Sequence, residues 1–313
     1  MGKATIAVCG PTASGKSALA LALAETVDGI VINADAMQVY RQLRILTARP
    51  GPADEARVPH RLYGVLSAAE SCSVARWRDL ALAEIAAAHG AGRVPILVGG
   101  TGLYIRALSD GLAAVPEIPR EVRDEAAARH RALGGEAFQA ELGRRDPVMA
   151  GRLAPGDRQR LIRAWEVHRW TGRSLADWQA EAPPGPGLPG PLVTVVMIPP
   201  RAVLYDRIDA RFRAMVGAGA VAEVGRLLAL DLAPSLPAMK ALGVKQLGAH
   251  LAGDYDLEGA ILAAQTATRR YAKRQMTWFR NQIREAFWTD AKDLETLRLE
   301  IFPKIVDFLL TTE

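Results

Sequence analysis

Short apolar runs of strand type alternate with helical patterns along the first third of the chain. The runs lie at 5–9, 29–33 and 94–98, and helical stretches such as 74–89 separate them. A fourth run follows at 192–198. Apolar strands that alternate with helices are typical of a parallel sheet covered by helices on both faces. The pattern therefore predicts an α/β fold with a helix-flanked parallel sheet.

The alternation stops near Pro116 and resumes after a Pro/Gly-rich stretch from Pro183 to Pro191, which is typical of a linker. Between them the sequence has only charged helical patterns. We therefore predict a core formed by residues 1–117 and 187–313, interrupted by an inserted all-helical domain at 118–186. From 119 to 173 this insertion has twelve Arg, no Lys and eight acidic residues. The positive excess suits a polyanionic partner, although an ordinary solvated helical surface would have a similar pattern.

The last third of the chain is helical again. We expect helices at 202–215, 221–230 and 257–283. Between residues 269 and 284 the longest pattern carries six Arg and Lys residues, interleaved with Tyr271, Trp278 and Phe279. Cations mixed with aromatic side chains can bind nucleic acid, but such aromatics more often lie in the core on the opposite face of the helix.

One motif indicates chemistry directly. The stretch Cys9-Gly-Pro-Thr-Ala-Ser-Gly-Lys-Ser17 matches the phosphate-binding loop G-x-x-x-x-G-K-[ST], and it lies between a strand pattern and a helix pattern as that loop should. Backbone N–H groups and the helix N-terminus would face an anion, Lys16 would add positive charge, and Ser17 could bind a phosphate-bound Mg²⁺. The fold class is thus a phosphate-loop NTPase-like sheet. The predicted phosphate-binding residues are Gly10, Pro11, Thr12, Ala13, Ser14, Gly15, Lys16 and Ser17.

The residues that follow the other strands decide between phosphate chemistries. A motor ATPase usually has an acidic residue directly after a buried strand, to hold Mg²⁺ and orient water. Here the third and fourth runs end in Val98-Gly-Gly-Thr101 and Ile198-Pro-Pro200, without an acid. Asp35, after the second run, is the strand-end carboxylate of this half, and it suits a group that acts on an acceptor near the phosphates. A lone Asp at a strand end can equally be a turn former or a helix cap.

Composition adds limits on location and partners. Half of the 313 residues are apolar, and the net charge of +5 leans towards a polyanionic partner. The two cysteines, Cys9 and Cys72, have neither a disulfide framework nor metal-ligand spacing, so we expect a reducing cytoplasm. The sequence has no signal-peptide pattern and no run of membrane-spanning length. We expect no membrane partner and a monomeric protein.

Several further motifs carry a resemblance to a known family. They are Asn33-Ala-Asp-Ala-Met-Gln-Val-Tyr-Arg41, Thr47-Ala-Arg-Pro50, Pro59-His-Arg-Leu62, Val98-Gly-Gly-Thr-Gly-Leu-Tyr104, Asp157-Arg-Gln-Arg-Leu-Ile-Arg163, Arg207-Ile-Asp-Ala-Arg-Phe212 and Ala272-Lys-Arg-Gln-Met-Thr-Trp278. Together with the phosphate loop, and in this order, they resemble the tRNA dimethylallyltransferase family. That family has a phosphate-loop core interrupted by a helical tRNA-binding insertion.

The resemblance implies transfer of a dimethylallyl group from dimethylallyl diphosphate to the exocyclic 6-amino group of the adenine just 3′ of a tRNA anticodon, with release of pyrophosphate and with Mg²⁺ as cofactor. It implies Asp35 as proton acceptor and Thr101, Arg211 and Lys16 as further catalytic residues. The implied metal ligand is Ser17. The implied tRNA-binding residues are Asp35, Ala36, Met37, Gln38, Thr101, Arg123, Gln159, Arg160, Leu161, Ile162, Arg163, Lys240, Lys245 and Arg274. The chain departs from the family pattern at Ala36, Leu46 and Val244, which bears on how the base is recognised.

Two other enzyme classes stay open, together with a non-catalytic RNA-binding module. An adenylate isopentenyltransferase would use the same donor and core but would not need a basic helical insertion. A small-molecule kinase would hold ATP in the phosphate loop and use Asp35 to activate a hydroxyl. A binding module would not need an intact Lys16-Ser17 pair.

Overall fold

The computed structural model describes residues 4–181 and 188–312, and their contacts divide the chain into two compact units. One unit comprises residues 1–109 and 186–313, and the other residues 110–185. We predicted the first boundary at 117/118. The structural boundary comes earlier because Val115 and Ile118, in the stretch before the first helix of the insertion, pack into the core of the helical unit.

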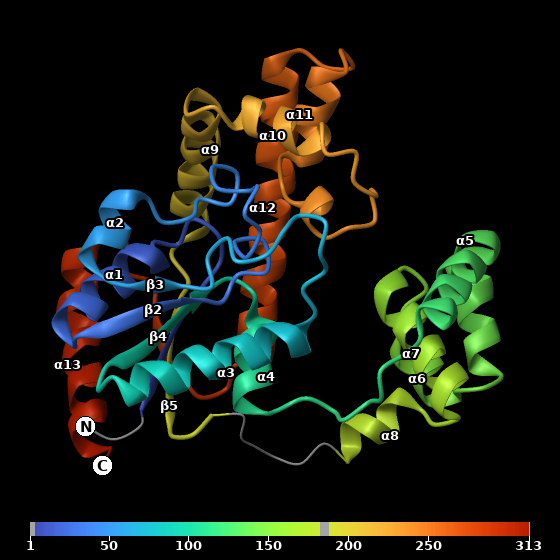
Figure 1. The fold of residues 1–313 in the computed structure, drawn as a ribbon, viewed down its shortest axis with the longest axis horizontal. Helices are drawn as coiled ribbons and strands as arrows, with labels where there is room; N and C mark the ends of the chain where they lie inside the picture. The colour runs from blue at the N-terminus through green and yellow to red at the C-terminus, as the bar shows by residue number, and fades with distance from the viewer. Residues whose placement is uncertain (1–3, 182–187, 313) are drawn as a thin grey trace. The chain divides into compact units, whose positions relative to one another are not determined.

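The larger unit is built on a six-stranded parallel sheet with the order β3-β2-β4-β1-β5-β6 (Figure 1). The strands are β1 (Thr5–Cys9), β2 (Gly29–Asn33), β3 (His60–Arg61), β4 (Val94–Gly99), β5 (Leu192–Met197) and β6 (Phe287–Thr289). The predicted parallel α/β sheet is therefore confirmed. The two edge strands β3 and β6 were not predicted, because segments of two and three residues with polar neighbours give no apolar run.

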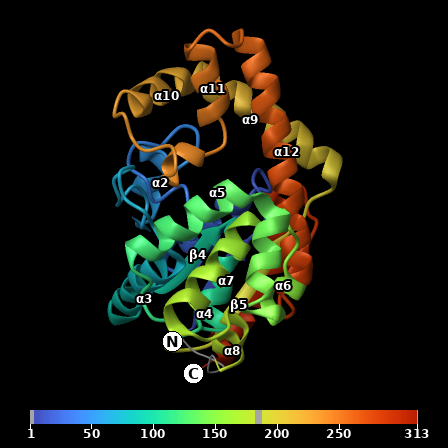
Figure 2. The same cartoon turned by 90° about the vertical axis from the view of Figure 1, so that its right-hand side faces the viewer.

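Helices cover both faces of this sheet (Figures 1 and 2). Alternate strand residues divide between two cores: Ile6 and Val8 pack with α1 and α13, whereas Ala7 and Cys9 pack with helices of the other face. This alternation is the period of two that a strand buried on both sides requires. The helices of this unit are α1 (Lys16–Thr26), α2 (Pro52–Arg57), α3 (Val74–Gly90), α4 (Gly102–Ser109), α9 (Arg201–Gly217), α10 (Ala220–Leu228), η1 (Ala238–Lys240), α11 (Val244–Leu251), α12 (Leu257–Gln282) and α13 (Leu294–Thr311).

The 26-residue helix α12 contains most of the mixed cationic and aromatic residues of the last third, and the structure shows which of them are buried. Its buried residues recur every three or four positions and include Phe279, so this aromatic belongs to the core. Trp278 is partly buried against the same core, whereas Lys273, Arg274 and Arg280 lie on the exposed side. None of the helices in the described ranges is long and apolar enough to cross a membrane.

Helices are the regular secondary structure of the smaller unit, and they are joined by loops and preceded by an irregular stretch at 111–119 in its described residues. It consists of α5 (Arg120–Gly143), α6 (Pro147–Arg152), α7 (Arg158–Thr171) and α8 (Leu175–Ala180). Phe138, Leu161 and Trp165 lie at the centre of its core. The helix α5 is interrupted at Gly134, whose φ of 75° lies in the left-handed region that glycine adopts without strain. Part of the Pro/Gly-rich stretch predicted as a linker lies outside the described residues.

Candidate active site at the phosphate loop

The phosphate loop joins β1 to α1 in a conformation that needs two glycines. A Cβ at Gly10 would lie 2.6 Å from the carbonyl oxygen of Met197 on β5, so any side chain there would displace the strand. Gly15 is the N-cap of α1 and has a φ of 98°, which non-glycine residues rarely adopt. The sharp turn at Gly15 places Lys16 and Ser17 in the first turn of the helix, where N–H groups without helical partners favour an anion.

A cavity of about 360 Å³ opens beside this loop. Three further segments contribute to its wall: the turn after β2, the chain that precedes α2, and one face of α9. The residues that line it are Thr12, Ala13, Gly15, Lys16, Ser17, Ala18, Asp35, Gln38, Thr47, Ala48, Arg207 and Arg211. The structure thus brings the predicted Lys16, Ser17, Asp35 and Arg211 together around one space. Parallel α/β sheets bind ligands at this carboxyl end of their strands.

The charges around the cavity influence one another. Burial lowers the pKa of Lys16 to about 8, with Arg211 acting in the same direction and the Asp35 carboxylate opposing both. Burial likewise lowers the pKa of Arg211, again opposed by Asp35. Two cations held close together with one carboxylate leave a positive excess, so the cavity favours a ligand with more than one negative charge.

The guanidinium groups of α9 reach the phosphate loop from the side. Arg211 donates a hydrogen bond to the Thr12 hydroxyl, and Arg207 donates one to the Ser14 carbonyl at 3.5 Å. Arg207 also donates to the carbonyl of Lys292. The two arginines are four residues apart, so they lie one helical turn apart on the same face of α9.

The Asp35 carboxylate is fixed by a short network at the end of β2. Its Oδ1 accepts the N–H of Met37 at 2.8 Å, and its own N–H donates to Asn33 Oδ1 at 2.8 Å. The Asn33 side-chain amide also donates to the carbonyls of Asp35 and Leu62, and the backbone carbonyl of Asn33 accepts the indole N–H of Trp77 at 2.9 Å. Asp35 is therefore a turn former, as the alternative explanation held, while its carboxylate still faces the cavity.

Thr101 lies in the loop after β4 and supports the same turn. Its hydroxyl accepts the N–H of Ala36 at 3.0 Å, next to Asp35, and its own N–H donates to the Ala34 carbonyl at 3.3 Å. The loop after β4 is not among the segments that line the cavity. Thr101 therefore touches the site through the backbone of the turn after β2.

Gln275 of α12 is a further residue of the site that the sequence prediction does not include, although it lies in the motif Ala272-Lys-Arg-Gln-Met-Thr-Trp278. Its side chain accepts the N–H of Thr12 at 2.9 Å and donates to the Gly100 carbonyl at 2.8 Å, so it joins the phosphate loop to the loop after β4. Its position on the buried face of α12, between Ala272 and Met276, is the signal that could have revealed it. A buried amide on an apolar stripe needs partners, and here the partners are the backbone of two functional loops.

The predicted RNA-contacting residues fall into two groups. In the larger unit Lys240, Lys245 and Arg274 have exposed side chains, whereas Ala36, Met37 and Gln38 are partly buried near the cavity. In the helical unit Arg123, Gln159 and Arg160 are exposed, Leu161 is fully buried, and Ile162 packs against the same core. The side chain of Leu161 therefore stabilises the unit from inside.

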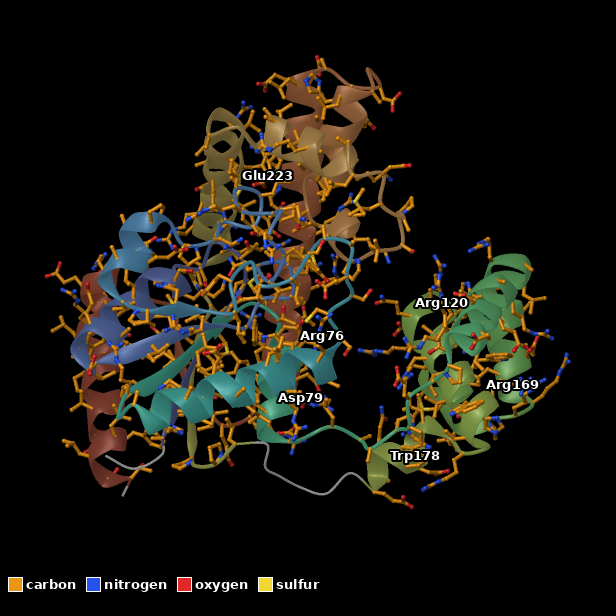
Figure 3. All side chains as sticks on the ribbon, viewed as in Figure 1. Arg76, Asp79, Arg120, Arg169, Trp178 and Glu223 are labelled. Atoms are coloured by element: carbon orange, nitrogen blue, oxygen red, sulfur yellow. The ribbon has the colours of Figure 1, made fainter. Side chains whose placement is uncertain are left out.

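Arg163 has a structural partner of its own. It pairs at 3.5 Å with Glu166, which is 9% exposed, and burial raises the pKa of that carboxyl while Arg163 opposes the rise. Arg160 pairs at 3.4 Å with Asp157 on the surface and is free to reorient. Figure 3 shows the side chains of the same unit, with Arg120 on α5 and Arg169 on α7 labelled.

The fold and the cavity define a phosphate-loop α/β protein whose basic cavity has a carboxylate beside its cations. Comparison with known proteins gives the family. The model described as IPP transferase matches residues 38–282, and the model described as isopentenyl transferase matches residues 4–68. The chain belongs to the IPP transferase family.

Individual relatives match over nearly their whole length. A protein of Rhodospirillum centenum named tRNA dimethylallyltransferase is 61% identical over 286 residues, covering 91% of this chain and 90% of the relative. One of Rhodospirillum rubrum with the same name is 56% identical, covering 89% and 86%. Among solved structures, the full-length tRNA isopentenylpyrophosphate transferase of Bacillus halodurans has a TM-score of 0.71 at 35% identity, covering 97% and 96%. A eukaryotic dimethylallyltransferase acting on tRNA has a TM-score of 0.84 at 24% identity, covering 99% and 80%, and shares the fold.

Proposed function

We propose that this protein transfers the dimethylallyl group of dimethylallyl diphosphate to the exocyclic amine of the adenine immediately 3′ of a tRNA anticodon, releasing pyrophosphate. The observation that carries the proposal is the meeting of Lys16, Ser17, Arg211 and Asp35 around one cavity. The strands that flank β1 are β4 and β5, and the residues directly after them are not acidic. Asp35 instead follows β2, which lies one strand beyond β4. A carboxylate in this position is better placed to act on an acceptor group than to orient water for ATP hydrolysis. The tRNA dimethylallyltransferase relatives support the substrates.

The reaction breaks the bond between the allylic carbon and its diphosphate oxygen and forms a bond from that carbon to the adenine nitrogen. The electron pair leaves with pyrophosphate, so negative charge builds up on the oxygens that face the phosphate loop. Backbone N–H groups of the loop, Lys16 and Arg211 would stabilise this charge. The hydrogen bond from Arg211 to Thr12 holds the guanidinium beside the loop before the donor binds.

The amine loses a proton once it has bonded to carbon. We assign the Asp35 carboxylate as the proton acceptor. Its Oδ1 accepts the Met37 N–H, and no described residue forms a hydrogen bond with Oδ2, so Oδ2 is available to a ligand in the cavity. An amine that carries a new carbon substituent and a positive charge is acidic, so an ordinary carboxylate suffices as base. Thr101 would act as a positioning residue, because its hydroxyl holds the Ala36 N–H directly after Asp35.

The residues at the cavity suit a divalent metal that the substrate itself helps to hold. No cluster of three or more His, Cys, Asp or Glu residues occurs in the described part of the chain. The cavity instead offers the Ser17 hydroxyl and other oxygen groups, the ligand type that Mg²⁺ prefers when phosphates complete its shell. We propose Ser17 as the protein ligand, and the metal when bound would neutralise charge on the leaving pyrophosphate.

The tRNA would be held by basic side chains of both units, with the target base flipped out of its stack to reach Asp35. In the helical unit we assign tRNA contacts to Arg123, Gln159, Arg160 and Arg163, of which Arg163 is also paired with Glu166. In the larger unit we assign Lys240, Lys245 and Arg274. We expect a monomer in a reducing cytoplasm, and both cysteines are unpaired.

The test offers labelled dimethylallyl diphosphate and Mg²⁺ to the purified protein with one of three acceptors: an anticodon stem-loop, AMP or water. We expect transfer to the stem-loop and release of pyrophosphate, without useful ATP hydrolysis. Prenylation of AMP faster than of the stem-loop would instead identify an adenylate isopentenyltransferase. ATP turnover stimulated by tRNA without prenyl transfer would refute the proposal.

A variant separates binding of tRNA from binding of the donor. Arg160→Ala removes an exposed charge without uncovering a buried partner, so we expect weaker stem-loop binding and a smaller salt dependence, at unchanged donor affinity. Arg57→Ala, which removes an exposed arginine paired with Glu25 in the larger unit, is the matched control. Equal stem-loop affinity in wild type and Arg160→Ala, measured at low salt, would remove Arg160 from the binding surface.

A further inference from the structure

Glu223 is a buried carboxylate that the proposed reaction does not use. It lies in the first turns of α10, is 4% exposed, and is labelled in Figure 3 where α10 approaches the chain between β2 and α2. Its oxygens accept the N–H groups of three consecutive residues, Arg44 at 2.9 Å, Ile45 at 2.8 Å and Leu46 at 2.9 Å. Within the described residues Glu223 forms no ion pair as close as 4 Å, although burial lowers the pKa of nearby Arg49 and the Glu223 charge opposes this effect. The backbone of 44–46 therefore forms an anion-binding concavity that is occupied by the protein's own carboxylate.

The segment held in this way continues directly into the cavity wall. Thr47 and Ala48 line the cavity on the side of the turn after β2. Their carbonyls accept the amide of Gln38 at 2.7 and 3.3 Å, and Gln38 lines the same cavity. Ala48 has a φ of 52°, a left-handed conformation that alanine adopts only when its surroundings impose it. The conformation of this wall thus depends on contacts outside the segment.

A second contact fixes the same segment from the apolar side. The Leu46 side chain is 8% exposed, and a Cβ built on Gly243 would lie 2.8 Å from its Cδ2 and 3.2 Å from a ring atom of Phe212. Phe212 follows Arg211 on α9. Leu46 is thus packed between α9 and the start of α11, while its N–H is held by α10. The hydrogen bonds to Glu223 and the packing of Leu46 therefore fix the same segment, which leads directly to Thr47.

We propose that Glu223 is a positioning residue for donor binding: by holding the N–H groups of 44–46 it fixes Thr47, Ala48 and Gln38 in the wall of the cavity that Lys16 also lines. This rests on the proposed function, in which the cavity takes a diphosphate. Without the carboxylate, the N–H groups of 44–46 lose their charge-assisted acceptor. Opening of this segment then becomes more favourable, because water can accept the three N–H groups instead. In the open conformation segment 44–48 no longer forms the cavity wall, so a smaller fraction of the molecules can bind the donor.

The test compares Glu223→Gln and Glu223→Ala with wild type, and uses Glu258→Gln as control because that exposed carboxylate, in the part of the chain that the structure describes, pairs with Arg213 at the surface. The probe is inorganic pyrophosphate with Mg²⁺, titrated by calorimetry. We expect its Kd to rise about tenfold in Glu223→Ala and less in Glu223→Gln, which keeps one acceptor oxygen. At saturating dimethylallyl diphosphate, kcat should stay within about threefold of wild type while KM rises, because the chemical groups are intact.

A merely structural role would lower the Tm of the variants and leave the pyrophosphate Kd and the donor KM within about twofold of wild type, and this result would overturn the inference. If wild type itself bound neither pyrophosphate nor the donor, the proposed function would fail first. Should both variants be insoluble, hydrogen exchange on wild type decides. Because coupling is reciprocal, pyrophosphate should slow exchange in 44–48 and in 220–228, and unchanged exchange in both segments would overturn the inference.

Discussion

Replacing Asp35 by Asn tests the proposed proton acceptor with little disturbance of the fold. The Asn side chain has the same shape, and its carbonyl oxygen can still accept the Met37 N–H that Asp35 Oδ1 accepts at 2.8 Å. Asn33 accepts the Asp35 N–H and donates to the Asp35 carbonyl, and Thr101 accepts the Ala36 N–H, so these hydrogen bonds involve backbone atoms of the turn and not the carboxylate. We therefore expect the free energy of unfolding to change by less than about 1 kcal/mol.

The chemical step should respond much more strongly. An amide cannot take the proton from the adenine nitrogen, and loss of a general base typically costs about 10²–10⁴ in rate, equivalent to about 3–5 kcal/mol of activation free energy. Donor affinity should be equal or higher, since a negative charge beside Lys16 and Arg211 has been removed from an anion site. The expected signature is a large fall in the single-turnover rate without weaker donor binding.

The assay follows transfer of label from dimethylallyl diphosphate to a stem-loop with enzyme in excess, so that product release does not limit the rate. Asp28→Asn is the matched control, because Asp28 is a surface residue paired with Arg93 at 2.6 Å in the same unit. A single-turnover rate for Asp35→Asn within about threefold of wild type would refute the base assignment. Asp35 would then be a turn former only.

Three other changes test the phosphate loop and the residues that contact it. Since the pKa of Lys16 is about 8 and an anion prefers the protonated form, the Kd for dimethylallyl diphosphate should rise above pH 8, by up to about tenfold per pH unit, and Lys16→Arg should flatten the profile. Arg211→Ala should lower the single-turnover rate about 10²–10³-fold at saturating donor, and a smaller loss than that of Arg213→Ala would contradict a role at the leaving group. Gln275→Leu should cost about 1–3 kcal/mol in denaturant unfolding, by leaving the Thr12 N–H and the Gly100 carbonyl without partners, and an unchanged stability would mean that water replaces both bonds.

The sheet could be predicted where strands are long and buried on both faces. Residues 5–9 and 29–33 are continuous apolar runs, and the strands β1 and β2 have those bounds. His60–Arg61 and Phe287–Thr289 pair only along one side at the edges of the sheet, so they need no apolar run. Their positions are fixed by neighbouring strands, which a local pattern does not contain.

The candidate site divides in the same way. The phosphate loop could be predicted because its motif lies in eight consecutive residues, and Asp35 because it follows a buried strand by two residues. Gln275 shows in the sequence only as a polar residue on an apolar helix stripe, and the partners of Gln275 and Glu223 could not be predicted, since their hydrogen bonds reach residues 263 and up to 179 positions away. In both cases the partner is a backbone group, which leaves no trace in the identity of the partner residue.

The two explanations of Asp35 in the sequence are compatible in the structure because a carboxylate has two oxygens. Oδ1 accepts the Met37 N–H and so fixes the side-chain rotamer at the end of β2. A carboxylate held in one rotamer loses less conformational entropy when a ligand binds, so the turn prepares the second oxygen for the proposed proton transfer. An Asn at this position can keep the bond to Met37 but cannot accept the proton, so one substitution separates the role in the turn from the role in the reaction.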